Sequence, residues 1–137
     1  MNKKSAIAQY QSVDINSAVL NASPHKLISL LFEGFLKRVM EAKGSVERGD
    51  KTSSSTAIGK AIAIIGELQA SLRNKEGNEL SQQLDGLYDY INRLLLQAGR
   101  EQSQDKLDEA AQLIIPIKES WDKIPAEYHN LSKNQAN

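Results

Sequence analysis

Four segments of the chain carry apolar residues at spacings of three and four, which is the repeat of an amphipathic α-helix. The first covers residues 23–48, the second begins within residues 51–55 and runs to about residue 74, and the last two cover residues 80–98 and 103–124. Polar or glycine-containing breaks separate them, and no segment has the two-residue repeat of a strand. Because short connections make consecutive helices antiparallel neighbours, the pattern predicts an all-α, up-down-up-down four-helix bundle.

The first segment has the clearest helix signals. Ser23 is a favoured N-cap, Pro24 suits the first helical position, and Gly49 stands where a C-cap belongs. The apolar arc of this helix covers well over a third of its circumference, and Leu36 and Met40 widen it further. A helix this apolar is typically buried on most sides. We therefore expect the other helices to pack around it.

The third and fourth segments carry regular core stripes. The expected stripes are Leu80, Leu84, Leu87, Ile91, Leu94 and Ala98, and then Leu107, Ala110, Ile114, Ile117, Trp121 and Ile124. Tyr88 and Tyr90 flank the first stripe, where each hydroxyl would stay in water. Gly99 is expected to end the third helix and Ser103 to cap the fourth. Pro116 removes one backbone hydrogen bond and predicts a kink in the last helix.

The second and fourth helices have apolar arcs wider than one core face requires. The surplus residues are Ile58, Ile62 and Ile65 on the second helix and Leu113 and Ile115 on the fourth. Two interpretations remain open from periodicity alone. The arcs could form a wide core with a few exposed members, which soluble proteins show routinely. Alternatively, they could line grooves that bind another amphipathic segment.

The two ends of the chain differ from this pattern. Residues 1–22 are mostly polar, with a short helix expected over residues 13–20 and isolated apolar side chains at Ile7 and Tyr10. Residues 126–137 are polar and are expected to be a disordered tail. The predicted organisation is thus a mobile N-terminal cap segment over 1–22, a bundle over 23–125 and a tail.

Composition narrows the function classes. The chain has 17 Lys and Arg residues against 17 Asp and Glu residues, so its formal net charge is zero. Nucleic acid or an anionic membrane as the main partner would require a basic surplus. There is no cysteine for disulfide or thiol chemistry. No apolar run resembles a secretory signal or reaches the length of a membrane span, so we expect a cytoplasmic protein without membrane insertion.

Candidate chemistry is sparse. His25 and His129 belong to no ligand cluster, and the chain has no Glu-x-x-His motif of the kind that carboxylate-bridged di-iron bundles use. His25 is expected at the surface. No glycine-rich loop resembles a phosphate-binding motif. The sequence therefore predicts no enzyme, no metal and no cofactor.

Several short stretches resemble the flagellar secretion chaperone family FliS. They are Ala22-Ser23-Pro24-His25-Lys26-Leu27, Leu31-Phe32-Glu33-Gly34, Lys60-Ala61-Ile62, Ile64-Ile65-Gly66-Glu67-Leu68 and Leu84-Asp85-Gly86-Leu87-Tyr88-Asp89-Tyr90. Trp121 late in the last helix and Tyr10 in the N-terminal segment also match the family. The stretches occur in order and at fitting spacing, so the resemblance extends over most of the chain.

The resemblance implies a cytoplasmic export chaperone. Such a protein binds the disordered C-terminal segment of flagellin one to one, prevents premature polymerisation and presents the subunit to the flagellar type III export gate. It uses no nucleotide and no metal. The five surplus apolar residues are then candidates for flagellin binding.

Ile7 and Tyr10 are candidates for contact with the export-gate protein's cytoplasmic domain, or for a cap over the empty groove. The alternative for this segment is a disordered tail. The alternative for the whole protein is a helical-bundle adaptor that self-associates or binds a flagellar regulator, with a homodimer when empty. The adaptor would bury its spare apolar surface in a stable dimer at low concentration, whereas the chaperone would bind a flagellin peptide.

Overall fold

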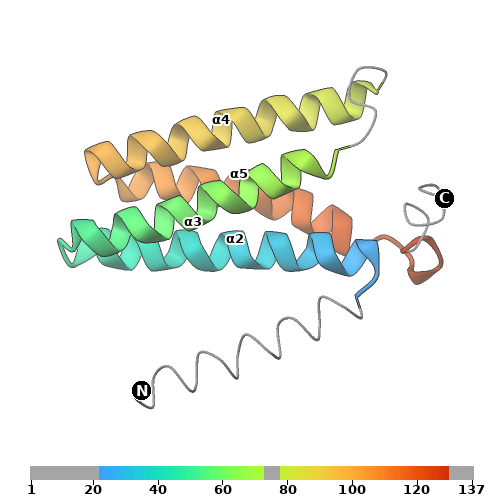
Figure 1. The fold of residues 1–137 in the computed structure, drawn as a ribbon, viewed down its shortest axis with the longest axis horizontal. Helices are drawn as coiled ribbons and strands as arrows, with labels where there is room; N and C mark the ends of the chain where they lie inside the picture. The colour runs from blue at the N-terminus through green and yellow to red at the C-terminus, as the bar shows by residue number, and fades with distance from the viewer. Residues whose placement is uncertain (1–21, 73–77, 130–137) are drawn as a thin grey trace, which may run out of the picture. The chain divides into compact units, whose positions relative to one another are not determined.

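The structure is a computed structural model that describes residues 22–72 and 78–129. In chain order its elements are α2 (Pro24–Glu47), α3 (Lys51–Ala70), α4 (Glu79–Glu101), α5 (Gln104–Asp122) and the 3-10 helix η2 (Ala126–Tyr128) (Figure 1). The described residues contain no strand. The predictions for the short helix over 13–20 and for Ile7 and Tyr10 concern residues outside the described part.

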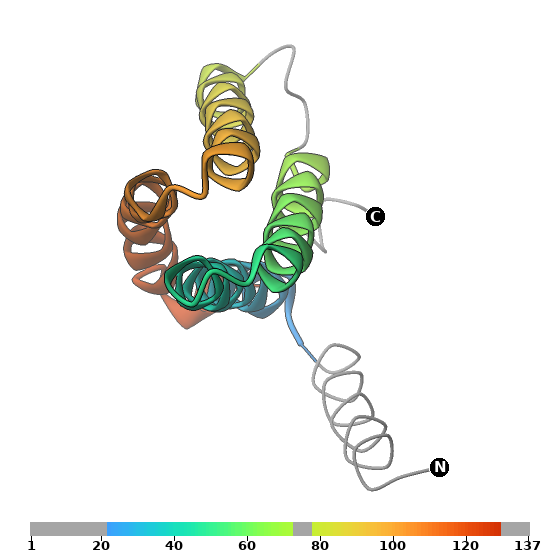
Figure 2. The same cartoon turned by 90° about the vertical axis from the view of Figure 1, so that its left-hand side faces the viewer.

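Residues 29–123 form one compact unit, in which the four helices run alternately in opposite directions. The end view in Figure 2 shows α3 and α5 on the two sides of α2, with α4 opposite. The all-α four-helix bundle is therefore confirmed. The prediction that α2 would be surrounded is wrong, because each helix of this bundle turns only one side inward. The side chain of Met40 is accordingly 73% exposed.

All four helices contribute to the core. Its apolar members are Phe32, Phe35, Val39 and Ala42 from α2, Ala57, Ile58, Ala61, Ile65 and Leu68 from α3, Tyr88, Ile91, Leu94, Leu95 and Ala98 from α4, and Leu107, Ala110 and Ile114 from α5. On α4 the buried face is rotated from the predicted stripe. Tyr88 is 3% exposed, whereas Leu84 and Leu87 are half-buried and Leu80 is 64% exposed. The prediction that Tyr88 would lie at an edge is therefore wrong.

Side chains cap the helix starts as their chemistry predicts. The Ser23 hydroxyl accepts the Lys26 N–H at 3.1 Å, and the Ser103 hydroxyl accepts the Lys106 N–H at 3.2 Å. Asp50 caps α3 by accepting the Ser53 N–H at 3.0 Å, and this hydrogen bond lowers the pKa of the Asp50 carboxyl.

The end of α4 differs from the prediction that Gly99 would terminate it. The helix continues to Glu101, and Gln102 adopts the left-handed conformation with φ 52°. A Cβ atom at Gly99 would lie 3.5 Å from the Ile58 side chain of α3, an ordinary contact distance, so this glycine lies where α4 meets α3 and not at a cap. Helix α5 continues through Pro116 to Asp122.

The two ends of the bundle are built differently. At the turn end, residues 48–50 join α2 to α3 and residues 102–103 join α4 to α5. At the loop end, residues 71–78 connect α3 to α4. Figures 1 and 2 show α4 and α5 close together at the turn end and diverging toward the loop end. This divergence leaves the inner sides of both helices less covered at the loop end.

A second compact unit contains residues 22–28 and the described residues from Ile124 onward. The rings of His25 and His129 stack at a centroid distance of 3.7 Å, and the His25 N–H donates to the His129 carbonyl at 3.3 Å. His25 is buried, so its predicted surface position is wrong. Helix η2 lies at the start of the predicted tail, and residues 130–137 lie outside the described part.

Candidate functional site

The structure divides the five surplus apolar residues into two groups. Ile58 and Ile65 are core residues, with 5% and 0% of their side chains exposed. Neither offers a surface to a partner in this conformation. Ile62, Leu113 and Ile115 are half-buried and keep part of their surface in solvent. Each of these three lies at a different helix–helix seam.

Ile62 lies at the seam of α3 and α4. It is two helical turns from Gln69, whose amide donates to the carboxylates of Asp85 and Asp89 on α4. Positions seven apart share a helix face, so Ile62 points toward the same neighbour. It stands one turn beyond Ile58, which contacts α4 at Gly99, and is therefore level with Leu95 and Leu96.

The same seam contains a polar atom without a partner. The Oδ1 atom of Asn92 is buried and has no hydrogen-bond partner in the described structure. Asn92 lies seven residues before Gly99, which places it on the side of α4 that faces α3. A buried carbonyl without a donor is destabilising by about 1–3 kcal/mol. The seam therefore contains an unmade hydrogen bond, a cost that the apolar core residues beside it do not have.

Leu113 lies at the seam of α4 and α5. It is one turn beyond Glu109, which accepts a hydrogen bond from the Tyr90 hydroxyl at 2.5 Å. This hydrogen bond to a carboxylate raises the pKa of Tyr90. Tyr90 and Glu109 therefore close one end of the seam, and Leu113 lies toward the loop end from them.

Ile115 lies at the seam of α2 and α5, opposite to Leu113 on the helix. It is seven residues from Asp108 and seven from Asp122, and both of these carboxylates contact α2. Asp108 forms an ion pair with Lys43. Asp122 accepts a hydrogen bond from the Ser29 hydroxyl at 3.3 Å. By the same spacing, Leu36 faces this seam from α2. The three exposed members of the predicted site therefore do not meet in one groove.

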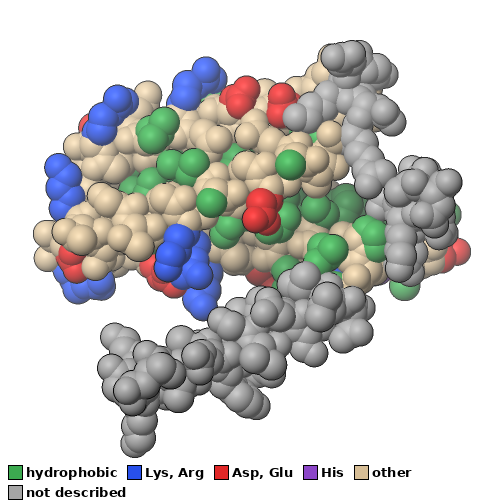
Figure 3. Space-filling view, viewed as in Figure 1, with side chains coloured by type: hydrophobic (Ala, Val, Ile, Leu, Met, Phe, Trp, Pro, Cys, Tyr) green, Lys and Arg blue, Asp and Glu red, His purple; other side chains and the backbone are tan. Residues whose placement is uncertain are grey.

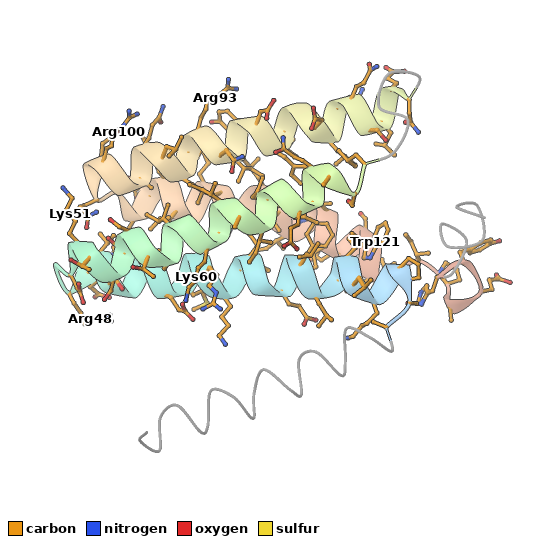
Figure 4. All side chains as sticks on the ribbon, in the orientation of Figure 1. Arg48, Lys51, Lys60, Arg93, Arg100 and Trp121 are labelled. Atoms are coloured by element: carbon orange, nitrogen blue, oxygen red, sulfur yellow. The ribbon has the colours of Figure 1, made fainter. Side chains whose placement is uncertain are left out.

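Further half-buried apolar side chains lie where α4 and α5 diverge. They are Leu84 and Leu87 on α4 and Ile117 and Trp121 on α5. Figure 4 shows Trp121 near the C-terminal end of α5. Sequence reasoning assigned all four to the core, because they continue the regular stripes. Periodicity carries no signal for the divergence of two helices, so it missed this surface.

The apolar surface also extends along α3. Figure 3 shows apolar side chains on both sides of this helix, over its borders with α4 and α2. Leu96 of α4 is 55% exposed, and Ile64 of α3 is half-buried beside Gly34 of α2. These side chains make the two borders of α3 a candidate surface for protein interaction.

One hollow on the described residues is polar and open to solvent. It has a volume of about 450 Å³, lies at the turn end and is lined by Val46, Glu47, Gln102, Ser103, Gln104 and Asp105. Within residues 22–72 and 78–129, no group of three His, Cys, Asp or Glu residues is placed to hold a metal ion. None of the described helices combines the length and apolar character needed to cross a membrane.

Comparison with known proteins identifies the fold's relatives. Residues 6–128 match the family described as Flagellar protein FliS. The chain is 41% identical over 119 residues to flagellar secretion chaperone FliSB of Pseudomonas aeruginosa, covering 87% of this chain and 94% of that protein. It is 38% identical over 125 residues to flagellar secretion chaperone FliS of Salmonella typhimurium, covering 90% and 93%.

A third relative is similar at lower identity. The chain is 30% identical over 112 residues to flagellar secretion chaperone FliS of Bacillus subtilis, covering 82% of this chain and 80% of that protein. The family match, over residues 6–128, spans all four helices of the bundle. The chain therefore belongs to the FliS family of flagellar secretion chaperones.

Proposed function

We propose that this protein binds the disordered C-terminal segment of flagellin one to one in the cytoplasm, prevents its premature polymerisation and delivers it to the flagellar type III export gate. Membership of the family supports the coarser role of a flagellar export chaperone with an export substrate. Flagellin as that substrate, and the export gate as the destination, are the proposal.

The observation that carries this proposal is the distribution of exposed apolar surface. Ile62, Leu113 and Ile115 lie at three different seams, and a further apolar surface lies where α4 and α5 diverge. A single folded ligand in one pocket could not contact all of these sites. A disordered segment that orders on binding buries on the order of 1,000–3,000 Å² and needs an extended track. The described surface fits such a ligand.

Substitution of Ile62 tests the proposal. In Ile62→Asp, the carboxylate would stand at a half-buried position, and we expect the protein to remain helical while losing affinity for a flagellin C-terminal peptide. Circular dichroism and calorimetric titration measure the two properties. Ile65→Asp places the same charge in the core and should unfold the bundle. Gln112→Asp, at an exposed position of α5, should leave both properties unchanged.

If Ile62→Asp is folded and binds the peptide with full affinity, Ile62 is not part of the proposed track. Leu113→Asp and Ile115→Asp extend the same measurement to the other two seams. Loss of peptide affinity in all three variants would support a track that crosses all three seams. Unchanged affinity in all three would contradict the proposed track.

The N-terminal segment is proposed to act as a cap and as the export-gate contact through Ile7 and Tyr10. Flagellin would displace the segment and make both residues available to the gate, which would then distinguish loaded from empty chaperone by differential affinity. Deletion of residues 1–15 should preserve or improve peptide binding and abolish binding of the loaded complex to the gate protein's cytoplasmic domain. Equal gate binding by the loaded deletion variant would exclude the contact.

A second candidate is a self-associating adaptor that binds a flagellar regulator. The exposed Met40 favours it, because Met40 lies beside Leu36 on the α2 side that faces Ile115, and exposed methionines adapt to varied partners. Sedimentation at low protein concentration separates the two candidates. A stable dimer that Met40→Glu converts to monomer would support the adaptor, and a monomer that binds flagellin peptide would support the chaperone.

A further inference from the structure

One part of the surface combines apolar and basic side chains. It lies over α3 and α4 in the half of the bundle nearer the turn end. We call it the basic strip, and define it by Lys51, Lys60, Ile62, Arg93, Leu96 and Arg100. Figure 4 shows Arg93 and Arg100 on the outer side of α4, Lys60 on the side of α3 away from α4, and Lys51 at the turn end. Ile62 and Leu96 form the apolar centre between these charges.

The four bases of the strip are exposed, and none of them makes an ion pair with another described residue. The seams of α5 differ in this respect. There, Lys43 pairs with Asp108, Lys106 with Glu101, and Lys118 with Asp122. The positive charge of the strip is therefore available to a partner that brings carboxylates.

The shape of the strip admits a helix. The outer face of α3 carries small residues at Gly59, Ala63 and Gly66, and a Cβ atom at either glycine would meet open space. Low side chains allow two helices to approach to about 8 Å between their axes. A helix lying there would have Ile62 and Leu96 at one edge and Lys60 at the other.

We infer that the basic strip binds an acidic amphipathic helix of the export substrate, with apolar residues on Ile62 and Leu96 and carboxylates between Lys60 and the pair Arg93 and Arg100. The inference rests on the proposed function, because Ile62 is part of the proposed flagellin track. The inference adds that the part of the substrate bound at the strip is helical and acidic. The seams at Leu113 and Ile115 lack unpaired bases among the residues named there, so the acidic requirement is local.

The charges of the basic strip favour an acidic amphipathic helix over two other ligands. Residues 1–21 of the chain itself contain Lys3 and Lys4 but only one acidic residue, Asp14, so the chain's own N-terminal segment is poorly matched to four unpaired bases. A polyphosphate backbone would match the charges but would leave the apolar centre without a partner. An amphipathic helix with carboxylates along its flanks satisfies both features.

The test uses the full-length protein with two charge-reversed variants. Arg93→Glu/Arg100→Glu reverses the strip, and Lys37→Glu/Lys123→Glu makes the same change in net charge at exposed positions elsewhere. The probes are the cognate flagellin C-terminal segment, a synthetic helical peptide of Leu, Ala and Glu, and its counterpart with Lys in place of Glu. Calorimetric titration at two salt concentrations gives the affinities.

We expect the strip variant to bind the flagellin segment and the acidic peptide about tenfold more weakly than the wild type, since several exposed ion pairs are lost together. The control variant should bind as the wild type does, added salt should weaken the wild-type interaction, and the Lys peptide should not bind. Ala63→Gln prevents the close approach of a helix to α3 without a change in charge. It should therefore also weaken binding of the acidic peptide.

Two failures are distinguishable. If the flagellin segment binds the wild type but the strip variant retains full affinity, the inference is wrong and the proposed function stands. Equal binding of the acidic and Lys peptides would likewise overturn the inference. If the flagellin segment does not bind the wild type, the proposed function is wrong, and the assignment of the strip to the substrate falls with it.

Discussion

The turn end and the loop end of the bundle use the same kinds of residue to different effect. At the turn end, Leu95 and Leu107 are fully buried, and the Ser54 hydroxyl is linked to Gln102 across α3 and α4 at 3.3 Å. At the loop end, Leu84 and Trp121 are only half-buried, because α4 and α5 diverge. The comparison indicates that α4 and α5 are packed completely at the turn end and less completely at the loop end, which leaves apolar side chains of both helices there for binding.

The largest expected effect comes from comparing a Leu→Ala substitution at the turn end with one at the loop end. Leu107→Ala removes a fully buried side chain at the turn end and should reduce the free energy of unfolding by about 3–5 kcal/mol. Leu84→Ala at the loop end should cost about 1–2 kcal/mol, because part of that side chain already contacts water. Urea denaturation of both variants measures the difference. Equal losses would contradict the difference in packing of α4 and α5 between the two ends.

The next largest effect is on the pH dependence of stability and involves Tyr88, which is buried between the two ends of the bundle. Burial raises the pKa of Tyr88 from 10.0 to about 12. The unfolded chain ionises this hydroxyl near pH 10, so the stability contributed by the protonated form is complete below pH 10 and is lost as the pH rises to 12. The loss should amount to roughly 2 kcal/mol.

Thermal unfolding between pH 9 and 12, compared with Tyr88→Phe, isolates this contribution, because the other titrating groups are shared. The Phe variant should retain more stability than the wild type as the pH rises. Parallel curves for the two proteins would mean that Tyr88 is accessible to water.

A smaller effect is expected from the polar link at the turn end. The buried Ser54 hydroxyl donates to the Lys51 carbonyl at 2.9 Å and contacts the Gln102 amide. Ser54→Ala should reduce the free energy of unfolding by about 1 kcal/mol, since it leaves the Gln102 side chain with one partner fewer. Ser55→Ala, at an exposed neighbouring position, provides the control. A loss no larger than in the control would show that Gln102 is held by Gly99 alone.

The smallest effect should have the opposite sign. Asn92→Leu removes the unpartnered Oδ1 atom from the seam of α3 and α4 and should raise the free energy of unfolding by about 0.5–1 kcal/mol. Asn92→Asp would place a charge at the same position and should destabilise the protein. Destabilisation by Asn92→Leu would indicate that the amide has a hydrogen-bond donor in solution.

Sequence periodicity alone predicts part of this structure but not which residues each helix buries. The four helices, the caps at Ser23 and Ser103 and the bundle topology follow from spacing and local chemistry, because these are set within a few residues. The burial of Tyr88 and the exposure of Met40 do not follow, since they depend on how far each helix is rotated and which neighbour it meets. The same limit explains Ile58 and Ile65, whose wide apolar arc was equally compatible with a groove.

The unequal connections of the bundle also have a consequence for its kinetics. Residues 48–50 and residues 102–103 join their helices by short turns, so the hairpins α2–α3 and α4–α5 bring together residues close in sequence. Local contacts of this kind form early in folding, and low contact order speeds the reaction. Amide hydrogens at the loop end should then exchange through partial openings that leave the turn end intact. A chaperone built this way could release its substrate by a local opening, without unfolding as a whole.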